Sequence, residues 1–223
     1  MNIYKDIETR TNGEIYIGVV GPVRTGKSTF IKRFMELRVL PAIADDNNRK
    51  RAMDELPQSA AGKTVMTTEP KFIPKEAVEV LFEDGVHFKC RMIDCVGYMV
   101  QGAEGHEEDG KERLVKTPWF DYDIPFTKAA EIGTKKVIYD HSTVGIVVTC
   151  DDTISELDRS AYIQPETQTI QELKTLGKPF IVILNTRKPA SPETLELAQQ
   201  MEAEYGVGVL PINCDQLRKA DVV

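Results

Sequence analysis

The sequence predicts an α/β fold, with a mainly parallel sheet, an antiparallel edge strand and helices on both faces of the sheet. Two observations carry this prediction. Apolar runs of strand length alternate along the chain with amphipathic patterns of helical period, which is typical of a parallel sheet covered on both sides. One run, by contrast, alternates apolar and charged residues, which indicates a half-exposed strand at an edge.

The expected elements follow from these patterns in chain order. The strands are expected at Glu14–Val20, Ala77–Phe82, Val86–Ile93, Thr143–Thr149, Pro179–Leu184 and Val207–Ile212. The helices are expected at Lys27–Leu37, Thr127–Tyr139, Thr167–Leu176 and Pro192–Tyr205. Gly177 and Pro179 give one clear helix stop, and Ser191 before Pro192 gives a helix cap followed by a first-turn proline.

The run Val86–Ile93 is the expected edge element, because His87, Lys89 and Arg91 alternate with its apolar residues. Pairing with Ala77–Phe82 across a short turn would make an antiparallel hairpin. Two stretches, residues 40–70 and 97–126, show no such periodicity apart from a short polar helix in the first. Residues 97–126 are expected to be loop-like, and loops of this length inside a compact domain are usually functional or disordered.

Composition excludes several classes of function. The chain has 223 residues and a net charge of −7, and an acidic balance argues against a general nucleic-acid binder, which needs clustered cations on its phosphate-facing surface. No apolar run approaches the roughly 18 residues that span a bilayer. The polar N-terminus lacks the apolar core of a signal peptide, so the sequence predicts a protein that is not exported.

The cysteines and histidines indicate no structural metal site. The four cysteines lack C-x-x-C spacing and have apolar neighbours, so we expect buried reduced thiols; they are Cys90, Cys95, Cys150 and Cys214. The three histidines are isolated from one another.

The segment GPVRTGKST matches the phosphate-binding pattern G-x-x-x-x-G-K-[ST] at every defined position and lies between an expected strand and an expected helix. Backbone N–H groups of such a P-loop cradle phosphates at a helix N-terminus. We expect Lys27 to reach the β and γ phosphates and Ser28 to ligate Mg²⁺. The nucleotide-binding residues predicted here are Gly21, Pro22, Val23, Arg24, Thr25, Gly26, Lys27, Ser28 and Thr29.

Asp94 and Gly97 form a D-x-x-G pattern at the end of an expected strand. A carboxylate at this place holds Mg²⁺, usually through water, and the glycine N–H contacts the γ-phosphate. Thr67 and Thr68 lie between the two motifs, where a threonine commonly ligates Mg²⁺ and senses the γ-phosphate. Spacing does not separate the two threonines.

The residue after D-x-x-G in Ras-like enzymes is a glutamine that orients the attacking water. Here this residue is Tyr98, which cannot serve in that way. Gln101, His106 or a residue from a neighbouring subunit remain open as substitutes.

Base recognition is expected near residues 185–188. A guanine site ends its strand in N-K-x-D, but this chain has Asn185, Thr186 and Lys188 at the first, second and fourth positions. Because a lysine has no acceptor for guanine N1–H and N2–H₂, the sequence predicts ATP over GTP. Asn185 is expected to bridge this loop to the P-loop, and Lys188 to point to solvent.

With these motifs in place, the chain resembles the stage IV sporulation protein A family. The resemblance is carried by GVVGPVRTGKSTFIKRFMEL, DELPQSAAGKTVMTTEPKFIP, IDCVGY, TPWF, IPFTKAAEIGTKKVI and DHSTVGIVV, and it covers essentially the whole chain. It implies a P-loop NTPase of the translation-factor-related, GTPase-like type that hydrolyses ATP. Lys27 would be the Walker A lysine, Asp94 the Walker B aspartate, and Thr67 and Thr68 the sensor threonines.

The resemblance also implies a biological setting. Family members use ATP hydrolysis to polymerise around the forespore, in the mother-cell cytoplasm, as the basement layer of the spore coat. Their partners would be further copies of the same protein, spore coat proteins and a small amphipathic membrane-bound peptide. Members are about twice this length, so this chain is expected to be an N-terminal ATPase domain, and activities of the other regions need not belong to it.

Three functional hypotheses remain open from the sequence. The first is an ATPase whose hydrolysis drives self-assembly, and the second is a nucleotide-dependent scaffold or switch with incidental turnover. The third is an ordinary GTPase. The switch-like D-x-x-G and threonine loop argue against a small-molecule kinase.

Overall fold

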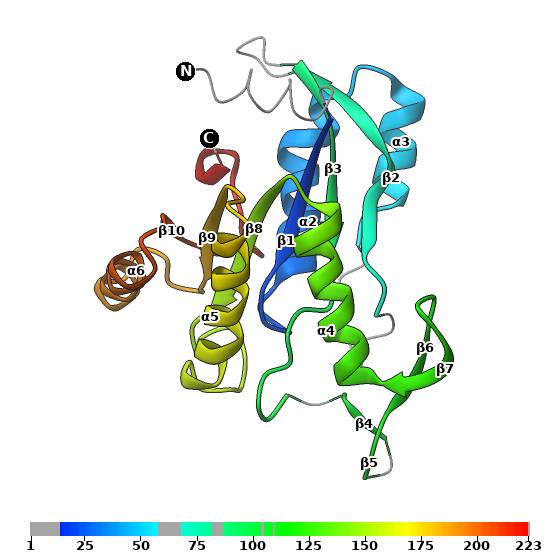
Figure 1. Ribbon diagram of the computed structural model, residues 1–223. Helices are drawn as coiled ribbons and strands as arrows, with labels where there is room; N and C mark the ends of the chain where they lie inside the picture. Colours follow the sequence, from blue (N-terminus) through cyan, green and yellow to red (C-terminus); the bar gives the residue numbers. More distant parts are fainter. Residues whose placement is uncertain (1–13, 58–67, 82–86, 104, 109, 223) are drawn as a thin grey trace.

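The structure is a computed structural model, and it describes residues 14–57, 68–81, 87–103, 105–108 and 110–222. A six-stranded sheet with the order β10-β9-β8-β1-β3-β2 forms its centre (Figure 1). The strands are β1 (Glu14–Val20), β2 (Lys71–Leu81), β3 (His87–Asp94), β8 (Val144–Cys150), β9 (Phe180–Asn185) and β10 (Val209–Ile212). Every neighbouring pair is parallel except β2 with β3, so the predicted parallel sheet is confirmed.

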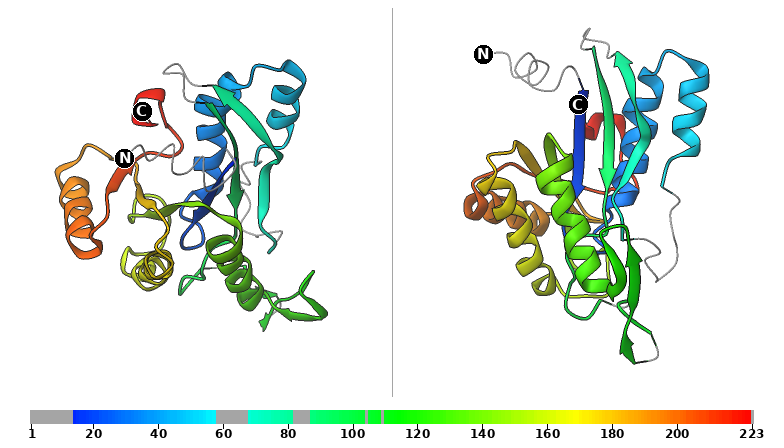
Figure 2. Two further views of the ribbon diagram at one scale, coloured as in Figure 1. Left: turned by 45° about the horizontal axis from the view of Figure 1, so that its top comes forward. Right: turned by 45° about the vertical axis from the view of Figure 1, so that its right-hand side comes forward.

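Helices cover both faces of this sheet, as predicted (Figure 2). Side chains one residue apart on a strand enter different cores: Val19 packs with α2 (Lys27–Phe34) and α3 (Asp46–Asp54), whereas Val20 packs with the helices of the opposite face. That opposite face carries α4 (Phe126–Lys136), α5 (Ser160–Thr175) and α6 (Pro192–Tyr205). The alternation of buried residues explains why the central strands are apolar throughout.

The antiparallel edge pair of β2 and β3 is confirmed, although β2 begins six residues earlier than predicted. A register shift between Ile73 and Val78 interrupts the pairing, and Pro74 lies within it. Proline is tolerated there because an edge strand at a bulge needs no ladder hydrogen bond from that nitrogen. The predicted turn between these strands, with Phe82 and Val86, lies outside the described residues.

The expectation that residues 97–126 form a loop is wrong. They contain two short hairpins, which pair β4 (Glu107–Glu108) with β5 (Lys111–Glu112) and β6 (Leu114–Thr117) with β7 (Phe120–Pro125). Both hairpins extend away from the main sheet beside the start of α4 (Figure 1). Strands of two to six residues are too short to show a clear period in the sequence.

Helix ends differ from the prediction in two ways. α2 and α4 each continue into a π-helical turn, η1 (Met35–Val39) and η3 (Val137–His141), and η2 (Leu40–Ala42) follows the first. α5 begins seven residues earlier than expected, with Pro165 inside it. Burial of Tyr162 and Glu166 against the core stabilises this first part of the helix despite the proline. The short polar helix expected in residues 40–70 is α3, and the last described element is η4 (Lys219–Val222).

All four cysteines are buried and free, as predicted. Among the described residues, no helix is long and apolar enough to cross a membrane.

Candidate active site

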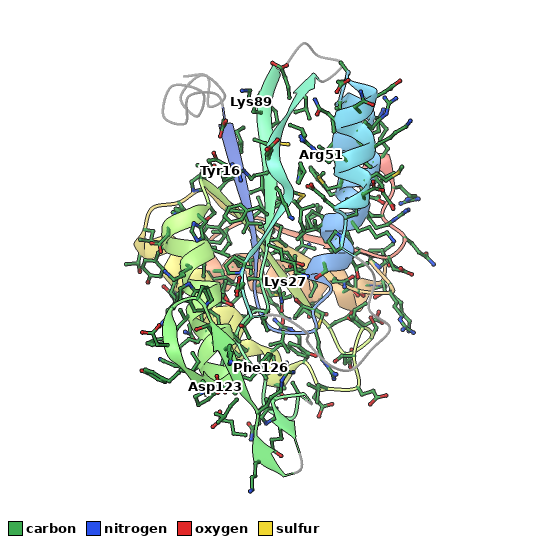
Figure 3. All side chains as sticks on the ribbon, turned by 90° about the vertical axis from the view of Figure 1, so that its right-hand side faces the viewer. Tyr16, Lys27, Arg51, Lys89, Asp123 and Phe126 are labelled. Carbon is green, nitrogen blue, oxygen red and sulfur yellow. The ribbon has the colours of Figure 1, made fainter. Side chains whose placement is uncertain are left out.

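The predicted site residues converge at the carboxyl edge of the parallel strands. β1 leads into the P-loop, β3 ends at Asp94, and β9 ends at Asn185. Strand register brings these ends together, since Val19 pairs with Asp94 and Cys150 pairs with Asn185. This edge is where open α/β sheets bind their ligands. Figure 3 shows Lys27 in the middle of the molecule, below the sheet strands.

The P-loop backbone needs its glycines. Gly21 has φ 131° and Gly26 has φ 95°, both in the region that favours glycine. A Cβ on Gly21 would lie 2.3 Å from the Val148 carbonyl oxygen, and one on Gly26 would lie 2.4 Å from Asn185 Nδ2. A side chain at either position would therefore clash with these neighbouring atoms.

Of the other P-loop residues, some are buried and hold the loop in place, and one is exposed to solvent. Pro22 and Val23 are buried, and the Thr25 hydroxyl donates to the carbonyls of Pro22 (3.0 Å) and Val148 (2.7 Å). Arg24 is exposed, with φ 61°. The loop is thus fixed to β8 by Thr25.

α2 begins at Lys27 with Gly26 as its cap, and no side chain accepts a hydrogen bond from its first turn. The first N–H groups of a helix have no partner within the helix and attract anions. Ser28 and Thr29 lie in this turn, with Ser28 exposed. An uncapped turn after a glycine-rich loop is the arrangement that phosphates require.

Lys27 lies almost entirely inside the site, with only 5% of its surface exposed. Its ammonium donates to the Pro22 carbonyl at 2.5 Å. Burial lowers the pKa of Lys27, and the nearby Cys95 and Asp94 oppose that shift. A phosphate would supply the counter-charge that this buried ammonium otherwise obtains from Asp94.

Ser28 and Asp94 are joined directly, because the Ser28 hydroxyl donates to Asp94 Oδ2 at 2.6 Å. The other carboxylate oxygen, Oδ1, is buried without a hydrogen-bond partner among the described residues. Burial raises the pKa of Asp94, while the Ser28 hydrogen bond and the Lys27 charge lower it. A hydroxyl beside an unsatisfied carboxylate oxygen is a donor set that fits Mg²⁺. The described residues contain no group of three or more His, Cys, Asp or Glu side chains that could hold a metal ion by themselves.

Gly97 lies against the P-loop, as the D-x-x-G pattern predicts. Its φ is 99°, and a Cβ there would lie 2.2 Å from the Gly21 carbonyl oxygen and 2.6 Å from Lys27 Nζ. Its N–H donates to the Thr134 hydroxyl of α4 at 3.2 Å. Sequence reasoning missed Thr134, which follows Gly97 by 37 residues and belongs to no motif.

We expect Gly97→Ala to reduce nucleotide turnover by about tenfold or more, because the methyl group would displace Lys27 and strain the backbone by about 1–3 kcal/mol. Steady-state phosphate release measures this. The matched control is Gly110→Ala, whose φ of 72° carries similar strain but whose Cβ would meet nothing within 4 Å. Equal turnover in the two variants would contradict the placement of Gly97 at the phosphates.

Thr68 is buried, whereas Thr67 lies outside the described residues. Thr68 precedes Lys71 by three residues, and Lys71 is the strand-register partner of Asp94. The Thr68 carbonyl oxygen also lies against α4, where a Cβ on Gly133 would approach it to 2.4 Å. The threonine loop therefore approaches the same edge of the sheet as Asp94.

Tyr98 occupies the position of the absent glutamine and is buried. Its backbone N–H donates to the Gly21 carbonyl (3.2 Å), and its carbonyl accepts from the Val23 N–H (2.9 Å). Its hydroxyl donates to Glu172 of α5 at 2.5 Å. Tyr98 thus joins the D-x-x-G loop to the P-loop and to α5, a role that no sequence signal indicated.

Within the part of the chain that the structure describes, no hydrogen bond or ion pair joins the other two candidates for water positioning to the phosphate-site residues. Gln101 is exposed, and His106 Nε2 lies 3.7 Å from Glu107 in β4.

Asn185 bridges the base loop to the P-loop, as predicted. Its amide donates to the Thr25 carbonyl at 2.9 Å, and its Oδ1 accepts from the Cys214 N–H at 3.0 Å. Thr186 is fully buried, and its hydroxyl oxygen accepts from the Lys188 N–H at 3.0 Å. Lys188 is exposed, so the prediction that it points to solvent is confirmed.

A comparison with known families agrees with these motifs. The sequence model described as "Stage IV sporulation protein A, ATPase domain" matches residues 1–223. The chain belongs to this family. It is 57% identical over 221 residues to stage IV sporulation protein A of Clostridioides difficile (strain 630), which covers 99% of this chain and 45% of that protein. It is 53% identical over 223 residues to the protein of the same name from Bacillus subtilis (strain 168), covering 100% of this chain and 45% of that protein.

Family membership implies a sporulation-related ATPase domain. The chain spans about half the length of the curated relatives that it matches.

Proposed function

We propose that this chain is a Mg²⁺-dependent ATPase, which converts ATP to ADP and phosphate, and that hydrolysis drives self-assembly into the basement layer of a spore coat. One observation supports the proposed ATP hydrolysis. The Ser28 hydroxyl donates a hydrogen bond to Asp94 at 2.6 Å, and this pair lies beside buried Lys27 and the uncapped first turn of α2. This arrangement supplies donors for phosphate oxygens and oxygen ligands for a divalent cation in one place.

Each residue has a defined task in this proposal. The α2 N-terminus and Lys27 bind and orient the β and γ phosphates, while Ser28 and Asp94 hold Mg²⁺ together with Thr67 or Thr68. When bound, Mg²⁺ neutralises charge that develops on the transferred phosphoryl group. Gly97 presents its N–H toward the γ-phosphate once the bond to Thr134 opens. Tyr98 offers no group that orients the attacking water, because its hydroxyl already donates to Glu172.

The nucleotide is proposed to be ATP, because the base loop lacks the carboxylate that guanine requires. The antiparallel edge strand, D-x-x-G and bridging Asn185 support a translation-factor-related, GTPase-like ancestry. In the proposed setting, the protein acts in the mother-cell cytoplasm at the forespore surface. Its partners there are further copies of itself, spore coat proteins and a small amphipathic membrane-bound peptide, and it binds no nucleic acid.

A nucleotide-dependent switch is the second candidate, and the position of Tyr98 favours it. A buried tyrosine in place of the water-orienting glutamine predicts slow turnover, which a scaffold that only needs bound nucleotide would tolerate.

The two candidates are separated by phosphate release, measured with and without Mg²⁺ across a series of protein concentrations. We expect a dilute-chain rate of about 10⁻⁴ to 10⁻² per second, as in GTPases without an activating partner, and a higher rate per chain as assemblies form. A rate that stays constant while assemblies form on a non-hydrolysable ATP analogue would favour the switch. A dilute chain that turns over hundreds of times faster would mean that a complete catalytic set exists within one copy.

Substitution at the Mg²⁺ ligands should separate binding from turnover. We expect Asp94→Ala to weaken Mg²⁺ retention, because Asp94 holds the only unsatisfied buried carboxylate oxygen among the described residues around Lys27. Thr67→Ala with Thr68→Ala should leave ATP affinity intact and slow hydrolysis, because the P-loop binds the phosphates before the threonine loop closes. Equilibrium binding and phosphate release measure the two effects. Hydrolysis at the parent rate in the double threonine variant would remove this loop from the mechanism.

A further inference from the structure

The Thr134 hydroxyl of α4 holds the Gly97 N–H, which is the group expected to meet the γ-phosphate. The Gly97 N–H donates to Thr134 Oγ1 at 3.2 Å, and the Thr134 hydroxyl donates in turn to the Ala130 carbonyl, one helical turn earlier, at 2.8 Å. Because its single proton is used within the helix, the hydroxyl presents only lone pairs to the D-x-x-G loop. Thr134 is fully buried, so it accepts the Gly97 N–H in a place that bulk water does not reach.

Gly97 lies against the phosphate site on its other side. A Cβ on Gly97 would lie 2.6 Å from Lys27 Nζ, so its backbone is next to the group that is proposed to bind the β and γ phosphates. The peptide after Gly97 is fixed, because the Tyr98 N–H donates to the Gly21 carbonyl at 3.2 Å. The peptide before it carries the Gly97 N–H and can rotate at the glycine, which adopts either sign of φ. One N–H cannot point at Thr134 and at a phosphate oxygen with good geometry at the same time.

The neighbouring residue of α4 contacts the threonine loop. A Cβ on Gly133 would lie 2.4 Å from the Thr68 carbonyl oxygen. A glycine inside a helix is unfavourable, and here the close approach of this carbonyl requires it. Two consecutive residues of α4, Gly133 and Thr134, therefore contact the two loops that are expected to surround the γ-phosphate.

Contacts with the hairpin region hold α4 in place on one side. The Phe126 N–H, at the start of the helix, donates to the Arg113 carbonyl at 2.8 Å. The Lys136 ammonium, at its last residue, lies 5.6 Å from the Trp119 ring centre. The hairpin region thus contacts α4 at its first residue and again at its last.

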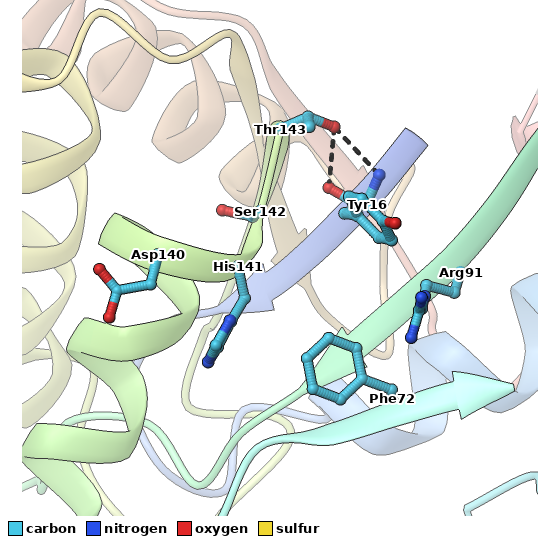
Figure 4. A pocket seen from close by; sticks show the side chains of 7 residues that line it. All are labelled: Tyr16, Phe72, Arg91, Asp140, His141, Ser142 and Thr143. Carbon is cyan, nitrogen blue, oxygen red and sulfur yellow. Dashed lines mark hydrogen bonds between the residues drawn. The ribbon is translucent and has the colours of Figure 1, made fainter. Parts of the chain in front are cut away.

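The η3 end of the helix is tied to the sheet beside a second cavity (Figure 4). This cavity, of about 500 Å³, lies between β1, β2, β3 and the end of η3. The hydroxyl oxygen of Thr143 accepts from the Tyr16 N–H at 3.0 Å, and the Thr143 N–H donates to the Tyr16 carbonyl at 2.8 Å. The Lys178 ammonium donates to the Ser142 carbonyl at 2.7 Å. We therefore expect the D-x-x-G loop, and not the helix, to move when the bond to Thr134 opens.

We propose that Thr134 is a positioning residue that competes with the γ-phosphate for the Gly97 N–H and thereby sets the preference of the site between ATP and ADP. The proposal rests on the nucleotide site of the proposed function. Without a γ-phosphate, in the nucleotide-free and ADP-bound chain, the Gly97 N–H stays on Thr134. ATP binds by replacing that bond, so Thr134 weakens the binding of ATP and leaves the binding of ADP unchanged. After hydrolysis, Thr134 takes the N–H back as phosphate leaves.

The first experiment measures the affinities of ADP and of a non-hydrolysable ATP analogue, both with Mg²⁺. In Thr134→Val, which keeps the shape of the side chain and removes the acceptor, we expect the analogue to bind about fivefold to tenfold more tightly. The affinity for ADP should stay at the parent value, because the Gly97 N–H lacks its partner equally before and after ADP binds. Thr134→Ser restores the hydroxyl and should restore the parent ratio of the two affinities.

Thr169→Val is the matched control. Thr169 of α5 is also fully buried, and its hydroxyl donates to the carbonyl four residues earlier, that of Pro165, at 2.8 Å. Its loss should leave the ratio unchanged. A purely structural role of Thr134 would weaken both ligands alike or neither, so an unchanged ratio in Thr134→Val would overturn the proposal, as would an equal rise in Thr169→Val. A raised ratio in Thr134→Val of a chain that hydrolyses no ATP would contradict the proposed function alone.

The second experiment tests the Gly97–Thr134 bond without nucleotide. Amide hydrogen exchange of Gly97 is followed by NMR in the nucleotide-free chain labelled with ¹⁵N-glycine, and the resonance is assigned by its loss in Gly97→Ala. We expect exchange at least tenfold faster in Thr134→Val than in the parent, and parent-like exchange in Thr134→Ser and Thr169→Val. Equal exchange in Thr134→Val and the parent would contradict the proposal, even in a chain that hydrolyses ATP.

Discussion

Replacement of Lys27 by alanine is expected to reduce the proposed ATP turnover about 10²-fold or more, which for a parent at the slow rate proposed above falls below the level that phosphate release detects. The ammonium is the one charged P-loop group that is buried at the α2 N-terminus, with 5% of its surface exposed. Its charge would act on the β and γ phosphates inside a site that water does not screen.

The same substitution has a second consequence. The Lys27 charge lowers the pKa of Asp94, so its loss should raise the pKa of that buried carboxyl further and make Mg²⁺ binding, which requires the carboxylate, weaken at a higher pH than in the parent. Lys32→Ala, in the last turn of the same helix, is the matched control and should retain turnover. Thermal unfolding of both variants checks that the fold persists. Hydrolysis at the parent rate in Lys27→Ala would remove the P-loop from the mechanism.

Nucleotide preference is expected to favour ATP over GTP by about tenfold to a hundredfold. A site that is built around a base's hydrogen bonds can reject an analogue by about 10⁴ to 10⁵, and the carboxylate which would supply that discrimination for guanine is absent here. The Lys188 ammonium carries hydrogen-bond donors and no acceptor, and it is exposed to solvent. We therefore expect it to weaken guanine binding only slightly and to leave adenine binding unaffected.

Competitive binding of ATP and GTP at equal Mg²⁺ measures this preference. The pair Thr186→Lys with Lys188→Asp should shift it toward GTP. Because Thr186 is fully buried, Lys188→Asp alone provides a variant that leaves the core unchanged. Arg187→Asp makes the same change of charge on an exposed neighbour and should have no effect on preference. A strong GTP preference in the parent would overturn the assignment of ATP.

The backbone geometry of the candidate phosphate-binding loop could be predicted from the sequence, because this loop is a local feature. Gly21, Gly26 and Lys27 lie within seven residues, and their φ angles and helix start follow from the loop itself. Asp94 and Asn185 were predictable for a related reason. Each ends an apolar run, and parallel strands bring their carboxyl ends to one edge.

Only the tertiary structure shows which distant side chains form hydrogen bonds with these motifs. Thr134 reaches Gly97 from 37 residues away, and Tyr98 reaches Glu172 from 74 residues away, and neither pair has a characteristic spacing. The early start of α5 likewise depends on burial of Tyr162, which outweighs the local preference of Pro165 against helix.

The hairpins and the second cavity show the same limit. β6 and β7 are too short and too exposed to produce a periodic signal, and their stability comes from contacts with α4. The cavity joins β1, β2, β3 and the end of η3, which are separated by up to 127 residues. Local order along the chain determined the fold class and the nucleotide motifs, because backbone conformation and strand polarity are local properties. Only packing of distant elements decided which side chains meet, because such contacts depend on the whole sheet and not on any one segment.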